Sequence, residues 1–144
     1  MALASLFGGL ALANSGLGAV HGFAAPIGGS FPAPHGAICA ALLPHVMAAN
    51  IRALRERMPD SSALARYDNI ARLLTNNPLA TADAGVEWVQ NLVADLSIPP
   101  LGTYGIGAEH IAGLVEKAAQ TSSMKANPVE LTSDELADTL RRAL

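Results

Sequence analysis

Four histidines are the side chains in this sequence that best suit metal chemistry. The histidines stand at positions 21, 35, 45 and 110, and the cysteine is Cys39. His21 and His35 flank a segment rich in glycine and proline, and neutral imidazole is a common ligand of Fe²⁺ or Zn²⁺. Two ligands do not hold a divalent ion tightly, because three or four are normal. The spacing alone therefore favours a structural or solvent-facing role for this pair over a metal site.

The other candidates have simpler interpretations. His45 lies in an apolar stretch, which predicts a core histidine whose hydrogen bonds are satisfied. His110 stands near a predicted helix start and is expected to be solvated. Cys39 has only apolar residues beside it in the sequence, without a local base or cation, which predicts an inert buried thiol. Trp88 and the valines and leucines near it are expected in the core.

Length and composition exclude several classes of protein. A chain of 144 residues predicts a single domain over 1–144. Apolar residues make up 51% and charged residues 15%, which excludes a disordered chain. The net charge of −3 and the aromatic content of 4% argue against a nucleic-acid partner. One cysteine cannot form an intrachain disulfide or a thiolate metal cluster, so a reducing cytoplasm is the expected compartment.

The charged residues are confined to the later part of the chain. The first of them is Arg52, so residues 1–51 carry no charge. A signal peptide needs a positively charged start, which this segment does not have. The apolar run over residues 2–13 is shorter than a membrane-spanning helix requires. We therefore predict no membrane segment, and we expect helices here that are buried on all sides within protein.

Apolar periodicity predicts the elements that position these residues, and the predicted class is all-α. A helix is expected over 2–18, with the small residues Ala4, Gly8, Ala11 and Ser15 on one stripe. Residues 21–36 hold four glycines and three prolines, which predicts a loop. A second apolar helix should run from His35 to about Met58, with a kink or restart at Pro44.

The charged part of the chain shows stronger helix signals. A helix is expected from Ser61 or Ser62 to about Leu74, and further helices over 80–96 and 107–121. SSMKANP predicts a loop, and the capping box Thr132-x-x-Glu135 opens a last helix. Its apolar stripe is Leu136 and Leu140. The predicted apolar side of the helix after Ser61 consists of Leu64, Ile70, Leu73 and Leu74.

The residues around His21 and His35 form a long and specific motif. GLGAVHGFAAPIGGSFPAPHGAICAALLPHVMAANI closely resembles the C-terminal domain of the iron-containing (group III) alcohol dehydrogenases, in the dehydroquinate synthase-like superfamily. The resemblance continues in order through IARLL, LSIPPLGTYGI and SSMKANPVELTSDEL. It therefore covers essentially the whole chain.

The resemblance implies a ligand set that this sequence contains only in part. The family binds its metal, Fe²⁺ or another divalent ion such as Zn²⁺, with one Asp and three His, and the last two histidines match His21 and His35. The Asp, the first His and the NAD(P)-binding α/β domain belong to sequence upstream of Met1. Many members carry a further histidine four residues after the ligand that matches His21, and this chain has Ala25 at that position. That departure puts a proton relay or cofactor contact in doubt.

Two hypotheses of different classes follow. In the first, the chain is the metal-binding domain of an enzyme that transfers hydride between an alcohol or carbonyl compound and NAD(P). In the alternative, it is a non-catalytic helical fragment or subunit that acts in oligomerisation or complements a separate nucleotide-binding chain. No catalytic or cofactor-binding residue is assigned within 1–144. The chain alone is expected to bind metal weakly, to lack NAD(P) binding and activity, and to form a homo-oligomer or bind the missing half.

Overall fold

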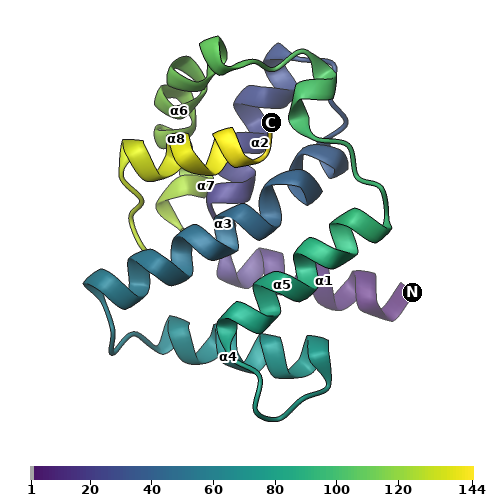
Figure 1. Cartoon of the computed structure of the whole chain (residues 1–144), viewed down its shortest axis with the longest axis vertical. Coiled ribbons are helices and arrows are strands. Elements are labelled where there is room, and N and C mark those ends of the chain that lie inside the picture. Colours follow the sequence, from purple (N-terminus) through teal and green to yellow (C-terminus); the bar gives the residue numbers. More distant parts are fainter. Residues whose placement is uncertain (1) are drawn as a thin grey trace.

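The computed structural model describes residues 2–144, and over this range it is all-α, as the sequence predicts (Figure 1). No strand occurs among the described residues. In chain order the elements are α1 (Ala2–Ser15), α2 (Ala19–Ser30), α3 (His35–Arg57), α4 (Ser62–Thr75), α5 (Ala82–Asp95), the 3₁₀ turns η1 (Leu101–Tyr104) and η2 (Ala108–His110), α6 (Ile111–Ala119), α7 (Ser122–Lys125) and α8 (Ser133–Arg142).

Helix α3 is the central element of the molecule. It contacts α2, α4, α5 and α8, and it crosses the middle of the view in Figure 1. The predicted restart at Pro44 does not occur. The helix continues through this buried residue as one element. By length and composition α3 could span a membrane, but 61% of its apolar window is buried inside the protein. Core packing thus accounts for its hydrophobicity.

The predicted loop over 21–36 is wrong for most of its length. Residues 19–30 form helix α2, which contains Pro26, and only Phe31–Pro34 connects it to α3. The reason is burial: Phe23, Ala24 and Ile27 recur at helical spacing and are at most 2% exposed against α3 and α6. Tertiary packing of one helical face outweighs the unfavourable propensities of glycine and proline.

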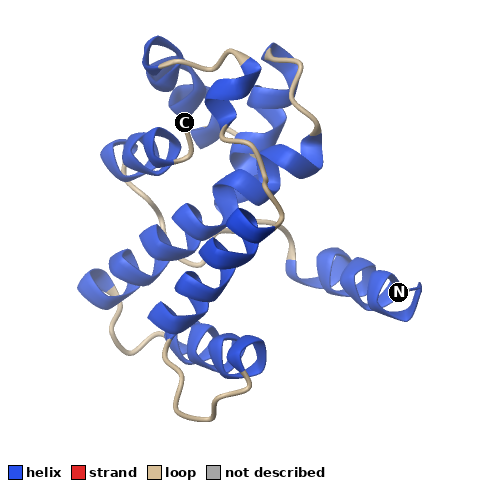
Figure 2. Ribbon diagram, turned by 45° about the vertical axis from the view of Figure 1, so that its right-hand side comes forward, coloured by secondary structure: helices blue, strands red, loops and turns tan. Residues whose placement is uncertain are grey.

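Helix α1 was expected to be buried, and within this chain it is not. It ends at Ser15 instead of residue 18, because Gly16 adopts a φ of +71°. The helix axis then turns by 99° into α2. No residue of α1 is buried, and in Figure 2 the helix projects away from the other helices. The elements that cover α2 therefore leave α1 open to solvent.

The predicted apolar side of α4 is also partly wrong, although its ends are as expected. Ser61 accepts a hydrogen bond from the Ala63 amide at 3.3 Å. Ile70 and Leu73 are exposed, whereas Ala71 is fully buried. A Cβ at position 85 of α5 would lie 3.0 Å from the Ala71 Cβ. Because α4 and α5 cross this closely, the buried face of α4 is centred on the small residue Ala71.

The last helix agrees with its sequence signal. Thr132 Oγ1 accepts the Glu135 amide at 3.2 Å, and the Glu135 carboxylate accepts the Thr132 amide at 2.7 Å. Leu136 and Leu140 are buried beneath α8, as predicted. The segment SSMKANP departs from prediction, since its first four residues form the short helix α7.

Candidate metal centre

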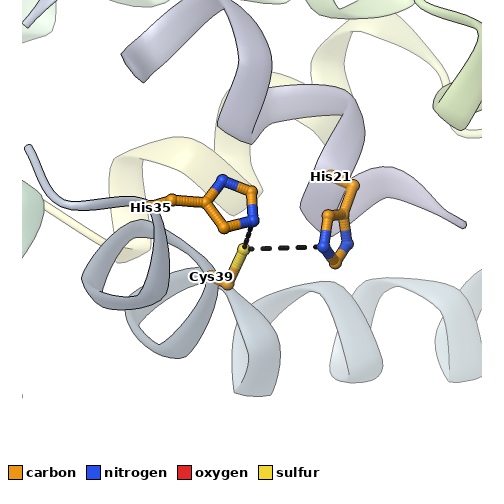
Figure 3. Close-up of side chains that lie close together, drawn as sticks. All are labelled: His21, His35 and Cys39. Atoms are coloured by element: carbon orange, nitrogen blue, oxygen red, sulfur yellow. Dashed lines mark hydrogen bonds between the residues drawn. The ribbon is translucent and has the colours of Figure 1, made fainter. Parts of the chain in front are cut away.

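His21, His35 and Cys39 lie together where α2 meets the start of α3 (Figure 3). His21 is on the first turn of α2, His35 is the first residue of α3, and Cys39 is one turn later. The Cys39 sulfur is 3.5 Å from His35 Nε2 and 3.9 Å from His21 Nε2. The two imidazole centroids are 5.3 Å apart and their planes are tilted by 50°. Ligand atoms of all three side chains lie within 4.8 Å of one another.

The start of α2, which carries His21, is held in place by Asn127. Asn127 Oδ1 accepts the Ala19 amide at 3.0 Å and so satisfies a free N–H of the first turn. A Cβ at Gly18 would lie 2.9 Å from this same oxygen. Glycine at position 18 therefore allows the Asn127 side chain to approach the helix end.

A partly buried polar network extends from Asn127 to Asn50 in the core. The Asn127 amide nitrogen donates to Asn50 Oδ1 at 2.7 Å and to the Val129 carbonyl at 2.8 Å. Asn50 is 3% exposed, and its amide nitrogen donates to the Tyr67 hydroxyl at 3.1 Å. This network fixes α2 relative to α3 and to the segment before α8. These residues were not predicted as part of the site, and their only signal in the sequence was a single asparagine within an otherwise apolar stretch.

Burial shifts the protonation of the cluster toward uncharged forms. The pKa of His21 is lowered by burial, and the neighbouring His35 lowers it further. His21 is therefore neutral at pH 7 and keeps a ring lone pair for a ligand. Burial raises the pKa of the Cys39 thiol, so the sulfur is protonated in the metal-free protein. The expectation of no nearby base is wrong for Cys39, because two imidazoles face this half-buried thiol.

An open pocket of about 410 Å³ lies beside the cluster. His21 and Cys39 are in its wall together with the polar groups of Asn50, Tyr67 and Asn127, and most of its other lining side chains are apolar. A pocket with a few convergent polar groups is typical of a small-molecule site. The arrangement combines imidazole ligands with adjacent space that a small organic molecule could enter.

The other two histidines lie apart from this cluster. His45 is half-buried on α3, and its pKa is lowered by burial and then by the charge of Arg142. His110 is half-buried instead of solvated: its Nδ1 accepts the Gly107 amide at 3.0 Å, and its ring makes a T-shaped contact with the Phe31 ring. Trp88 is half-buried at the edge of a small core cluster. None of these side chains belongs to the candidate site.

Comparisons with known proteins agree with the fold and with the sequence motif. The family described as Fe-containing alcohol dehydrogenase, C-terminal, matches residues 1–144. Lactaldehyde reductase of Escherichia coli (strain K12) is 35% identical over 96% of this chain and 35% of its own length. The 1,3-propanediol dehydrogenase of Klebsiella pneumoniae is 34% identical over 99% of this chain and 36% of its own length.

Solved structures of alcohol dehydrogenases match this chain over one region, about a third of their length. A 1,3-propanediol oxidoreductase superposes with a TM-score of 0.80 and 27% identity, over 98% of this chain and 36% of that one. An alcohol dehydrogenase from Oenococcus oeni gives a TM-score of 0.79 and 29% identity, over 94% and 35%. The chain spans about a third of the length of these relatives. It belongs to the iron-containing alcohol dehydrogenase family and corresponds to the C-terminal helical domain of that family.

Proposed function

We propose that this domain supplies two metal ligands, His21 and His35, to an NAD(P)-dependent oxidoreductase that interconverts an alcohol and a carbonyl compound. The observation that carries the proposal is the convergence of the two imidazoles. The Nε2 atoms of His21 and His35 both approach one sulfur atom, at 3.9 and 3.5 Å, although the residues come from two helices. The names of the relatives, which include a lactaldehyde reductase and a 1,3-propanediol dehydrogenase, support this reaction class.

The residues present fit a divalent ion. A lowered pKa keeps His21 neutral at pH 7, which is the form that binds metal. When bound, a divalent ion supplies Lewis-acid polarisation of an alcohol or carbonyl oxygen during hydride transfer to or from NAD(P). The chain's own contribution is to orient the two imidazoles through the α2–α3 contact and the Asn127 network. The pocket beside His21 offers the substrate a mostly apolar wall.

Titration of the protein with Zn²⁺ or Fe²⁺ under anaerobic conditions tests the ligand assignment. We expect binding that is weak for a metalloenzyme and that is lost in His21→Ala and in His35→Ala. His110→Ala is the matched control, because it removes a half-buried histidine outside the cluster. Calorimetry measures all four proteins. Equal metal affinity in wild type and His21→Ala would contradict the assignment.

NAD(P) binding is proposed to require protein outside residues 1–144. The chain has no strand followed by a glycine-rich turn and a helix, the arrangement that binds a pyrophosphate, within residues 2–144. Titration of NAD(H) or NADP(H) with Trp88 fluorescence as the signal should therefore show no saturation. Micromolar saturation would contradict this part of the proposal.

A cytoplasmic location, as expected from the lone cysteine, is part of the same proposal.

The partner of this chain is proposed to cover helix α1. Leu3, Leu6, Phe7, Leu10 and Leu12 are each about half exposed or more on a helix without charge. An apolar surface of this kind marks an interaction site. The relatives are about three times as long as the matched region, so we propose that the remaining part of the family fold covers α1. In its absence, two copies of residues 1–144 should associate through α1.

Sedimentation at low micromolar concentration tests this partner surface. Wild type should sediment above 14.8 kDa, and Leu6→Glu combined with Leu10→Glu should give the monomer mass. Leu79→Glu is the control, because Leu79 is 85% exposed on another part of the surface. A wild-type monomer, or equal association of the double variant and wild type, would overturn the proposal.

A further inference from the structure

We propose that Cys39 is a third metal ligand, so that His21, His35 and Cys39 form a site with two nitrogens and one sulfur for Zn²⁺ or a similar borderline ion. The inference rests on the proposed function, because it adds a ligand to the same two histidines. His35 and Cys39 are four residues apart on α3 and therefore lie on one face of that helix. Figure 3 shows both histidines directed toward the sulfur.

The distances from the Cys39 sulfur to the two histidine nitrogens suit one shared ion. Zinc binds thiolate sulfur at about 2.3 Å and imidazole nitrogen at about 2.0–2.1 Å in tetrahedral geometry, which separates the sulfur and nitrogen ligands by about 3.6 Å. The corresponding separations from the Cys39 sulfur are 3.5 Å to His35 and 3.9 Å to His21. Within residues 2–144, His21, His35 and Cys39 form the one group of three or more histidine, cysteine or acidic side chains whose ligand atoms lie this close together.

Charge gives a second and independent reason. Residues 1–51 contain no Asp, Glu or Tyr, so Cys39 is the one side chain in this segment that can become an anion. Neutral imidazoles contribute nothing to balance the double positive charge of the ion. On binding, the Cys39 thiol gives its proton to solvent as the sulfur–metal bond forms, with no change of oxidation state. The thiolate thereby supplies the only negative charge that this segment can offer.

The ligand types predict which ions the site prefers. Thiolate sulfur is a soft donor and imidazole suits zinc and cobalt, whereas Mg²⁺ and Ca²⁺ prefer oxygen ligands. Three ligands from this chain leave coordination positions free for ligands from outside residues 1–144 or for solvent. His35 is exposed and His21 and Cys39 line the open pocket, so an ion has a path to the site. We therefore expect zinc or cobalt to bind in preference to magnesium.

Cobalt spectroscopy tests the sulfur ligand directly. The full chain is titrated with Co²⁺ under anaerobic, reducing conditions, together with Cys39→Ala, His21→Ala and the control His110→Ala. Wild type and His110→Ala should show visible bands of tetrahedral cobalt and a near-ultraviolet band of thiolate-to-cobalt charge transfer. Cys39→Ala should lose the charge-transfer band. Its Zn²⁺ affinity should fall by at least about 10-fold, because removing even a group that only hydrogen-bonds to a metal ligand lowers affinity by about that factor.

The outcomes separate this inference from the proposed function. If wild type binds cobalt without the charge-transfer band and Cys39→Ala binds Zn²⁺ equally well, the sulfur ligand is overturned. The histidine assignment survives in that case, provided that His21→Ala still abolishes binding. If no protein binds cobalt up to millimolar concentration, or if His21→Ala binds as wild type does, both proposals fail.

Discussion

Helices α1 and α2 come from the same charge-free segment and have similar apolar compositions, yet their environments differ completely. Every described residue of α1 is exposed, whereas α2 buries Ala19, Gly22, Phe23, Ala24 and Ile27. The two helices are separated by a turn of three residues at Gly16, where the axis bends by 99°. Composition alone therefore does not decide burial, since α3 and α6 cover α2 and leave α1 open to solvent.

The difference also locates function within the segment. Helix α2 is held by packing and by the Asn127 side chain, so it can fix the position of His21 next to α3. Helix α1 makes no buried contact and offers instead a surface for further protein. A helix packed into the core carries the candidate ligand, and the adjoining helix carries the proposed interface. Each of the following experiments contrasts matched positions in these two regions or extends the contrast to the charged part of the chain.

The largest difference is expected for the two phenylalanines. Phe23 is fully buried, and Phe23→Ala should lower the free energy of unfolding by about 3–5 kcal/mol through lost burial and a cavity. Phe7 is 59% exposed, so Phe7→Ala should change it by about 0.5 kcal/mol or less and should weaken self-association instead. Urea unfolding of both variants at a protein concentration at which wild type is monomeric measures the contrast, because association would add to the apparent stability. Equal losses would mean that α1 is part of the folded core.

The two glycines should show the same contrast at smaller size. A Cβ at Gly22 would lie 2.8 Å from the Met124 Cε and 3.3 Å from its Cβ, so Gly22→Leu should cost about 1–3 kcal/mol by overpacking. A Cβ at Gly8 meets nothing within 4 Å, and Gly8→Leu should leave stability within about 0.5 kcal/mol. Thermal unfolding compares the pair. Both are measured on the monomer, and a strongly destabilised Gly8→Leu monomer would show that residues of the same chain cover α1.

The smallest effect should be a dependence on pH that arises in the charged part of the chain. Hydrogen bonds from Arg57 to Glu135, at 2.9 and 3.1 Å, hold the pKa of this carboxyl below its usual value of 4.5. A lowered acid pKa gives stability that is present above pH 4.5 and is lost as pH falls through the folded-state pKa. The loss is modest, because ion pairs near the surface contribute little.

Acid unfolding of Glu135→Gln measures this contribution. The variant should be less stable than wild type at pH 7, and its stability should decline less steeply below pH 4.5. Exposed Glu87 supplies the control, and Glu87→Gln should follow the wild-type curve. Identical acid limbs for Glu135→Gln and wild type would show that the Arg57 pair does not stabilise the fold.

Local patterns in the amino-acid sequence were sufficient to predict the helical class and most helix ends, and the motif around the histidines indicated the two candidate ligands. Ser61 and the Thr132–Glu135 box mark helix starts because their side chains satisfy free backbone amides close by in sequence. Such local signals need no knowledge of the rest of the fold. The motif around His21 and His35 was long enough to indicate the family.

Contacts between residues far apart in the sequence set which apolar helix is buried and what surrounds the histidines. Helix α2 forms despite Pro26 because α3 and α6 cover its apolar face, an interaction between residues far apart in sequence. Asn127 reaches Ala19 across 108 positions, and no local pattern encodes such a contact. Cys39 has apolar neighbours in the sequence but two imidazoles beside it in space, because its helix face turns it toward α2. The third donor of the candidate site therefore became visible only when the helices were placed together.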